Sequence, residues 1–412
     1  DLLQKDVIED LLIAYPTVTV GERDDLMDII IKIHNQTNDK FIFIIDEWDA
    51  ILREYDDNEE VVTSFVNLLR RLFKGDASAQ VFAGVYMTGI LPIKKYKTES
   101  ALNNFKEYSM LDSGVLAEYF GFTSEEVQFL CDKYKVSMDE CKRWYDGYKL
   151  GKWEMYAPLS VVNSILNSSF GSYWNATSSF EALKKYITMN FEGITEDVNQ
   201  LVAGKRVKVD VETFENKIDF NTKDDIFTYC IHLGYLSYDP ESKTCVIPNY
   251  EVRKEWIKSV QLSEKYKNSW QIIKNSQELL EATIAGDESR VAELVEQAHD
   301  MLANSLSYNR EQVLQVVIMM AYLYAREEYT VIQELPAGKG FADVAFIPYQ
   351  HKTDKPAIIV ELKLDKSTES GLEQIKNRNY PAGLEKYKDN MLLVGISYDS
   401  KTKKHTCDEM KM

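Results

Sequence analysis

The stretch AIIVELKLDK, residues 357–366, decides how the C-terminal part of the chain is interpreted. Successive side chains of a β-strand point to opposite faces, so Val360 and Leu362 share one face and Glu361 and Lys363 share the other. The strand is otherwise apolar, which predicts that it is mostly buried. Charged side chains on a buried strand need a partner, and this pattern therefore marks a candidate site.

A further acidic residue lies on the strand expected just upstream, where GKGFADVAFI (338–347) carries Asp343. If the strands at 341 and 357 pair as a hairpin, then Asp343, Glu361 and Lys363 converge on one patch. Two carboxylates about 4 Å apart repel each other by about 4 kcal/mol at an effective dielectric near 20, so such a patch calls for a cation. The simpler alternative is an ion pair between Glu361 and Lys363 on an edge strand.

Oxygen ligands favour Mg²⁺ or Mn²⁺ over zinc, so we expect Asp343 and Glu361 to hold one of these ions. Lys363 would offset part of the acidic charge and would position the attacking water or stabilise the charge that develops on the phosphate. Because the carboxylates repel each other, loss of one should leave the metal-free fold unchanged or slightly more stable. Loss of Lys363 should weaken the fold.

Three other residues can approach the same patch. Glu311 lies near the start of a predicted helix, and Gln374 and Tyr380 belong to LEQIKNRNY, which follows the charged strand. The elements expected in this part of the chain are helix 311–327, strands 330–335, 341–347 and 357–364, helix 369–378 and strand 391–398. They predict a compact α/β domain.

Near the N-terminus, two apolar strands frame a helix. FIFIID (41–46) is a continuous apolar run, as expected of a strand covered on both faces, and VFAGVYMTG (81–89) is similar. The segment 61–73 between them repeats apolar residues at helical spacing. This order predicts parallel strands joined by a crossover helix.

The acidic pair Asp46 and Glu47 follows the first of these strands, which is the layout of a Walker B element. In nucleotide hydrolases the first acid holds Mg²⁺ and the second orients the attacking water, and Thr88 lies where a sensor would touch the γ-phosphate. The alternative is an acidic cap of the next helix. The chain has no GxxxxGK[ST] phosphate loop. We therefore expect the chain to be a fragment whose phosphate loop precedes residue 1, and to bind ATP poorly as it stands.

Composition excludes several classes of protein. The chain has 412 residues, a formal net charge of −18 and five scattered cysteines without a CxxC pair, which argues against a disulfide framework and a structural zinc site and favours a reducing cytoplasm. Its longest strongly apolar helical stretch is too short to cross a bilayer. The net charge repels nucleic acid, but residues 352–404 hold eleven Lys and Arg against eight Asp and Glu. Lys376, Lys386 and Lys388 are candidate phosphate contacts there, although a solvated mixed surface explains the same pattern.

The remaining chain is mostly helical. TSEE (123–126) and SMDE (137–140) are capping boxes, and residues 224–256 are expected to run helix, strand, turn, strand, helix, an order compatible with a winged-helix-like module. Such a module either binds DNA or packs between domains. The expected domains are 1–120, a helical and winged-helix-like region 121–260, a helical connector 261–303 and the α/β domain 304–412.

Several motifs together resemble a known family. GKGFADVAFIP, PAIIVELK and LEQIKNRNY resemble the PD-(D/E)XK nuclease-like domain that ends a family of bacterial predicted AAA-ATPases, and the resemblance extends through FIFIIDEWDAIL, MTGILPIKKYKTESALNNF, WYDGYKLG and VIPNYEVR. It implies an α/β multidomain protein with a P-loop ATPase-like parallel sheet, a helical and winged middle and a restriction-endonuclease-like C-terminal domain. Asp343, Glu361 and Lys363 match the D, E and K of the nuclease motif, and Glu311 matches the first-helix acid more loosely. Physically, WYDGYKLG is typical of a turn with aromatic packing.

The sequence thus predicts a metal-dependent phosphodiesterase coupled to an ATPase-like domain, acting on nucleic acid through its C-terminal domain and on DNA rather than RNA. An oligomer is compatible with the sequence. The alternative from another class is a nucleotide-regulated interaction or scaffold protein whose nuclease-like domain does not cleave.

Overall fold

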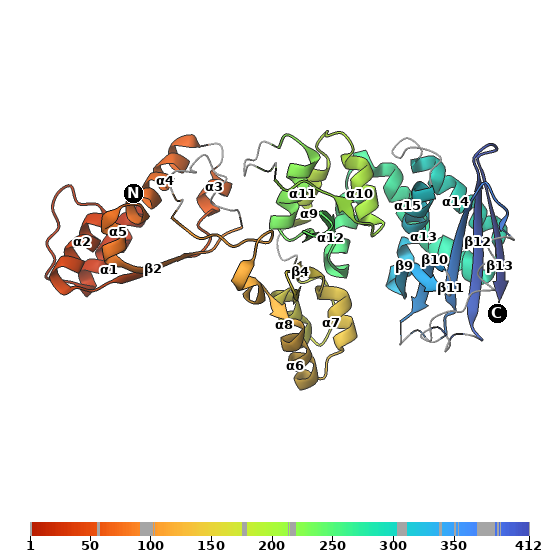
Figure 1. Ribbon diagram of the computed structural model, residues 1–412, viewed down its shortest axis with the longest axis horizontal. Helices are drawn as coiled ribbons and strands as arrows, with labels where there is room; N and C mark the ends of the chain where they lie inside the picture. Colours follow the sequence, from red (N-terminus) through yellow and green to blue (C-terminus); the bar gives the residue numbers. More distant parts are fainter. Residues whose placement is uncertain are drawn as a thin grey trace. The chain divides into compact units, whose positions relative to one another are not determined.

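The computed structural model describes residues 2–55, 58–90, 102, 104–174, 179–212, 214, 220–302, 311–337, 340–349, 352, 354–368, 384, 387 and 389–411. The chain forms two compact units, drawn in Figure 1. Unit 1 contains residues 1–120, 150–153 and 210–236, and unit 2 contains residues 121–149, 154–209 and 237–412.

Unit 1 is built from short helices around two strands. Its elements are α1 (Leu2–Ala14), α2 (Leu26–Thr37), β1 (Phe41–Ile45), α3 (Ala50–Glu54), α4 (Glu59–Phe73), α5 (Asp76–Val81), β2 (Phe82–Met87), the 3₁₀ helix η2 (Gly114–Tyr119) and α11 (Lys223–His232). The parallel pairing of β1 with β2 across the crossover helix α4 confirms the order predicted from the sequence. The additional helix α5 was not predicted.

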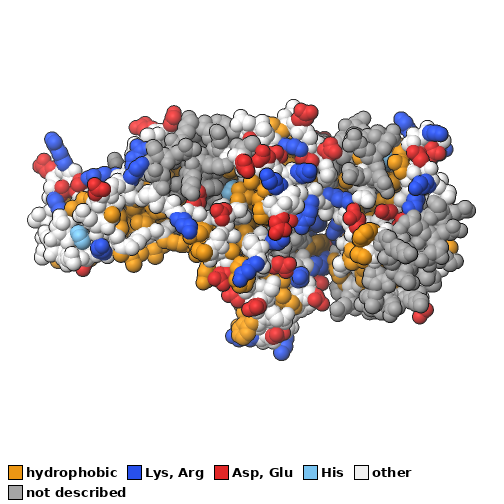
Figure 2. Space-filling view, viewed as in Figure 1, with side chains coloured by type: hydrophobic (Ala, Val, Ile, Leu, Met, Phe, Trp, Pro, Cys, Tyr) orange, Lys and Arg blue, Asp and Glu red, His pale blue; other side chains and the backbone are white. Residues whose placement is uncertain are grey.

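The prediction that β1 is covered on both faces is wrong for the part of unit 1 that the structure describes. Ile42 and Ile44 are 70% and 73% exposed, whereas Phe41, Phe43 and Ile45 pack against the core formed with α2 and α4. Hydrophobic side chains gather along β2 in Figure 2. A continuous apolar run therefore does not distinguish a strand covered on both faces from a strand that exposes one apolar face.

The middle of the chain contributes helices and short strands. Its elements are β3 (Phe122–Thr123), α6 (Ser124–Tyr134), α7 (Met138–Tyr145), β4 (Tyr148–Leu150), β5 (Trp153–Tyr156), α8 (Pro158–Leu166), α9 (Ser179–Ile187), α10 (Ile194–Val202), β6 (Val207–Lys208), β7 (Ser237–Asp239), β8 (Thr244–Val246), α12 (Tyr250–Gln261) and the 3₁₀ helix η3 (Glu264–Tyr266). Thr123 and Glu126 form the predicted capping box of α6. At α7, Ser137 accepts from the Glu140 N–H as expected, while the Glu140 carboxylate pairs with Arg143.

The order helix, strand, strand, helix predicted for residues 224–256 is present as α11, β7, β8 and α12, and β6 adds a third strand beside β8. Whether these elements act as a winged helix stays a prediction. The two motifs WYDGY (144–148) and VIPNY (246–250) pack against each other: Asn249 Nδ2 donates to the Asp146 carbonyl at 2.9 Å, and the rings of Trp144 and Tyr250 lie 4.6 Å apart, edge to face. The aromatic packing expected of WYDGYKLG is therefore present.

Gly147 makes the contact between these motifs possible. Its φ is 103°, and a Cβ atom there would lie 2.0 Å from the Pro248 carbonyl oxygen, so only glycine fits.

The C-terminal part of unit 2 is a five-stranded sheet with helices. Its elements are α13 (Lys267–Ala285), α14 (Glu288–Leu302), α15 (Glu311–Ala321), the 3₁₀ helix η4 (Leu323–Glu327), β9 (Tyr329–Ala337), β10 (Gly340–Pro348), β11 (Ala357–Leu364), β12 (Met391–Asp399) and β13 (Lys404–Lys411). The strand order is β13-β12-β11-β10-β9, with β11 and β12 parallel and the other neighbours antiparallel. This mixed α/β arrangement fits a restriction-endonuclease-like domain.

The two faces of this sheet are used differently. Val360 and Leu362 join the core that the sheet forms with α13, α14 and α15, and Ile359 belongs to a second cluster on the opposite face. The alternation predicted for residues 357–364 is confirmed, and it places Glu361 and Lys363 on the face of Ile359. The segment 261–303, expected as a connector, forms η3, α13 and α14, and the two long helices pack into this core.

The structure differs from the predicted C-terminal elements at two points. The helix expected over 311–327 ends at Ala321 and continues as the 3₁₀ helix η4, and the edge strand β13 was not predicted. The expected helix 369–378 lies outside the described residues. No described helix is long and apolar enough to cross a membrane.

Candidate functional site

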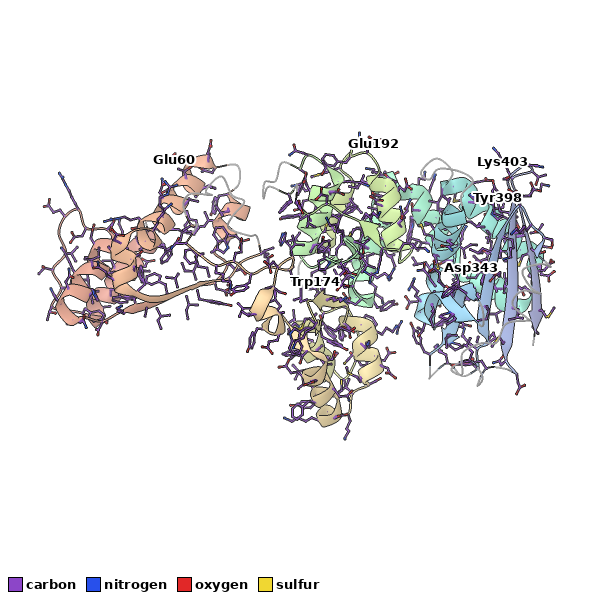
Figure 3. The ribbon with its side chains drawn as sticks, viewed as in Figure 1. Glu60, Trp174, Glu192, Asp343, Tyr398 and Lys403 are labelled. Carbon is purple, nitrogen blue, oxygen red and sulfur yellow. The ribbon has the colours of Figure 1, made fainter. Side chains whose placement is uncertain are left out.

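Asp343 and Glu361 lie at facing positions of neighbouring strands. Antiparallel pairing of β10 with β11 joins Val344 to Val360, so Asp343 and Glu361 are the next pair of that register. The pairing ends before them, and the Leu362 N–H instead donates to Asp343 Oδ2 at 2.7 Å. Figure 3 labels Asp343 within the C-terminal sheet. The hairpin predicted from the sequence thus brings the two acids together, and one oxygen of Asp343 also closes the end of the strand pair.

Glu361 and Lys363 form a largely buried ion pair. Glu361 is 2% exposed, and Lys363 Nζ lies 2.9 Å from Glu361 Oε1. A buried carboxylate requires a compensating charge, which the lysine two residues along the same face supplies. The alternative of an ion pair on an edge strand is wrong about the strand, because β11 is the central strand of the sheet. The contact itself agrees with the proposed site and with a purely structural ion pair, so it does not decide between them.

Lys205, which the sequence did not single out for this site, interacts electrostatically with Asp343. Its ammonium donates to Gln315 Oε1 on α15 at 2.8 Å. Burial lowers the pKa of Lys205, while the nearby carboxylates of Glu334 and Asp343 act in the opposite direction. Lys205 therefore brings a second cation from the end of α10 towards the acids. Its only sequence signal was a Gly-Lys dipeptide, which predicts nothing about the C-terminal sheet.

Glu334 lies on β9 opposite Asp343. Pairing of Ala342 with Leu335 and of Val344 with Gln333 frames this position. Glu334 has a φ of 52°, in the left-handed region that residues other than glycine adopt only rarely. The backbone of β9 is therefore distorted where it passes Asp343.

Several predicted site residues cannot be placed at this site. Only the main chain of Glu311 is described, at the first position of α15. Gln374 and Tyr380, together with the candidate phosphate contacts Lys376, Lys386 and Lys388, lie outside the described residues.

The acidic residues fit a hard divalent cation held by few protein ligands. Among the described residues, no group of three or more His, Cys, Asp or Glu is placed to hold a metal ion. Mg²⁺ commonly binds through one or two carboxylates and completes its shell with water and substrate phosphate, which matches Asp343 and Glu361. A structural zinc site would require thiolate or imidazole ligands, so the chemistry of these donors favours Mg²⁺ or Mn²⁺.

In unit 1, Asp46 and Glu47 contact Thr88, the residue that the sequence predicted beside them. Thr88 Oγ1 donates to Asp46 Oδ1, and the Glu47 N–H is 3.3 Å from Thr88 Oγ1, at the carboxyl ends of β1 and β2. Glu47 has a φ of 50°. Asp46, Glu47 and Thr88 thus lie together as expected, and their part in nucleotide binding stays a prediction.

The C-terminal geometry has a counterpart among known proteins. Residues 309–407 match the PD-(D/E)XK nuclease superfamily. This part of the chain is a PD-(D/E)XK nuclease superfamily domain. The match includes β9 to β12 and the three residues Asp343, Glu361 and Lys363. It covers none of unit 1, so the ATPase resemblance of residues 1–120 stays an expectation.

One curated relative is itself uncharacterized. Over 230 residues the chain is 24% identical to the "Uncharacterized protein in vnfD 5'region" of Azotobacter chroococcum mcd 1, a match that covers 55% of this chain and 42% of that protein. The match thus spans less than half the length of the relative. No solved structure was found to match the chain.

Replacement of Lys205 by methionine tests whether this lysine belongs to the site. Removing a cation near Asp343 should strengthen Mn²⁺ binding by about tenfold, because less positive charge then opposes the metal ion. The same change should weaken the binding of phosphate-bearing substrates by a similar factor. Mn²⁺ titration and cleavage kinetics of the Lys205→Met and Lys205→Arg variants would measure both effects. Unchanged Mn²⁺ affinity in Lys205→Met, with Lys205→Arg like the parent, would remove Lys205 from the site.

Proposed function

We propose that the PD-(D/E)XK nuclease superfamily domain is a metal-dependent phosphodiesterase that acts on nucleic acid, and on DNA in preference to RNA. The observation that carries the proposal is the placement of Asp343 opposite Glu361, with Lys363 bonded to Glu361 on the same face. A carboxylate pair with an adjacent lysine is the combination that metal-assisted hydrolysis of a phosphodiester requires.

Each of the three residues has a distinct part in this proposal. Asp343 and Glu361 hold the divalent cation, which when bound polarises the phosphate and lowers the pKa of a bound water. Lys363 orients the attacking water and stabilises the negative charge that develops on the phosphate oxygens. The hydrogen bond from Lys363 to Glu361 keeps the ammonium beside this carboxylate.

Nicking of supercoiled plasmid by the whole chain tests this proposal. Mg²⁺ or Mn²⁺ should convert the plasmid to the open-circular form, and chelation with EDTA should stop the reaction. A single-stranded oligonucleotide, duplex DNA and RNA of the same sequence should be compared in parallel. Absence of cleavage of all four substrates with either metal would count against the proposal.

The alternative is a nuclease-like domain that does not cleave and serves in a nucleotide-regulated interaction or scaffold protein. One observation favours it: Asp343 Oδ2 accepts from the Leu362 N–H, and Glu361 accepts from Lys363, so both acids also have structural partners. Metal binding separates the alternatives, because purely structural partners would leave the domain with no affinity for Mn²⁺ at these residues.

The N-terminal acids support a weaker proposal, that unit 1 holds a nucleotide-bound Mg²⁺ through Asp46 with Glu47 placed to orient water. The contact of Thr88 with Asp46 supports it. ATP is expected as a cofactor only where an upstream phosphate loop is present, since the chain itself contains no such motif.

A further inference from the structure

A cavity of about 840 Å³ in unit 2 lies among α7, α12 and the beginning of β9. Three arginines line it: Arg143 from α7, Arg253 from α12 and Arg326 from η4. Its volume is within the range of roughly 300–1,000 Å³ that is common for small-molecule sites.

Arg253 is buried and Arg326 is half-buried beside it, and no carboxylate pairs with either among the described residues. Arg253 is 8% exposed and donates through Nη1 to the Val202 carbonyl at 2.8 Å. Arg326 Nη2 donates to the Ala203 carbonyl at 3.3 Å, and its buried Nε has no hydrogen-bond partner. Among the residues that the structure describes, neither arginine forms an ion pair. Arginine is almost never buried unless it is paired, so this arrangement calls for an anion.

The charge of Arg326 adds to the cost of burying Arg253. Burial lowers the pKa of Arg253 well below its ordinary value, and the charge of Arg326 acts in the same direction. Burial lowers the pKa of Arg326 to about 10. Since a guanidinium stays protonated in proteins at neutral pH, these shifts express the cost of holding adjacent cations away from water.

Arg143, unlike the other two arginines, has a carboxylate partner and aromatic contacts in the wall of the cavity. Its guanidinium lies 4.3 Å from the ring centroid of Tyr250 and 4.5 Å from that of Tyr349, and it pairs with Glu140 at 3.2 Å. Asp139 is the other carboxylate of the lining. Glu140 therefore compensates Arg143. Lys142, which also lines the cavity, lies 3.9 Å from Asp146 and 3.6 Å from Glu154. Arg253 and Arg326 are therefore the lining cations that have no ion pair among the described residues.

We propose that this cavity binds the phosphate group of a nucleotide or of a nucleic-acid strand, with Arg253 and Arg326 as its principal donors. The planar fork of an arginine matches the oxygens of a phosphate, and two forks side by side provide several charge-assisted hydrogen bonds. The site is separate from the acids of the nuclease superfamily domain and does not depend on cleavage there.

The same arginines adjoin the segment that carries Lys205. They hold the carbonyls of Val202 and Ala203, and Gln333 Nε2 donates to the Gly204 carbonyl at 3.4 Å. A Cβ atom at Gly204 would lie 2.6 Å from Arg326 Nη2. An anion on the arginines would thus also brace the turn that brings Lys205 towards Asp343.

Calorimetric titration of the whole chain in EDTA, which removes metal from the acidic site, tests the proposal. Three probes separate the sources of the phosphate: inorganic pyrophosphate, ADP and a single-stranded 12-mer oligonucleotide. At least one probe should bind. Arg253→Met should lower the affinity for that probe by about tenfold or more, since a charge-assisted hydrogen bond contributes at least this factor to binding. Arg290→Met is the matched control, because Arg290 is a solvent-accessible arginine of the same unit that pairs with Glu278 and Glu293.

Binding of pyrophosphate or ADP would identify a free nucleotide as the source, and binding of the oligonucleotide alone would identify a strand. Hydrogen exchange of the unsubstituted chain guards against variants that do not fold, since a bound probe should protect residues 249–254 and 326–331. Binding should persist in Asp343→Asn whether or not the chain cleaves. Failure of all three probes, equal affinity in Arg253→Met, or protection elsewhere would overturn the proposal.

Discussion

Replacement of Glu361 by glutamine is expected to abolish metal-dependent cleavage, with a loss of at least about 10²-fold in rate. The variant keeps the shape of the side chain and removes the charge that a divalent cation needs, so the ion would no longer be held beside the phosphate. Asp343→Asn should behave in the same way. Lys363→Met should lose about 10²–10³-fold for another reason, since it removes charge stabilisation in the transition state. Plasmid nicking against metal concentration measures all three.

A matched control comes from the same strand pair of the sheet. Ser397 lies beside Lys363 in the parallel register of β11 and β12, and Ser397→Ala should leave cleavage within about threefold of the parent. Raised Mn²⁺ should rescue the carboxylate variants in part and Lys363→Met not at all. Full activity in Glu361→Gln would show that this carboxylate is not a metal ligand.

Loss of Lys363 should destabilise the metal-free fold by about 3–5 kcal/mol, as expected when one partner of a buried ion pair is removed. The Lys363→Met variant would leave the charge of Glu361 buried at 2% exposure. Loss of Glu361 should cost less, because the Lys363 side chain retains 14% exposure and its ammonium can reach water. Denaturant unfolding in EDTA compares Lys363→Met with Glu361→Gln. An equal decrease in the free energy of unfolding in the two variants would favour a purely structural ion pair.

Asp343 should depart from the expectation based on charge repulsion alone. Its Oδ2 accepts the Leu362 N–H at 2.7 Å, so Asp343→Ala leaves a backbone donor unsatisfied and should cost about 1–3 kcal/mol. Asp343→Asn keeps an oxygen acceptor and should cost less.

The sequence predicted the part of the candidate site that depends on strand periodicity. Alternation along residues 357–364 placed Glu361 and Lys363 on one face, and the hairpin with β10 brought Asp343 opposite Glu361. Both follow from local rules of strand geometry and pairing, which a sequence displays directly.

The remaining features depend on packing between distant segments. Lys205 reaches the acids from the end of α10, and no local pattern around it predicts that position. β13 was missed because KHTCDEMK is rich in polar residues and buries only His405 and Cys407. The exposed face of β1 was missed because an apolar run does not show what covers it. Arg253 and Arg326 were missed because they are distant in sequence, and only the folding of unit 2 brings them side by side.

The central claim is that Asp343 and Glu361 hold a divalent cation. Calorimetric titration of the whole chain with Mn²⁺, without any substrate, tests this claim most directly, because it needs no knowledge of the natural substrate. One Mn²⁺ per C-terminal domain should bind to the parent chain, and the affinity should fall by at least about tenfold in Glu361→Gln and in Asp343→Asn. The Asp46→Asn variant is the control for the N-terminal acids and should leave this binding unchanged. Equal Mn²⁺ affinity in the parent, Glu361→Gln and Asp343→Asn would contradict the assignment of these acids as a metal site.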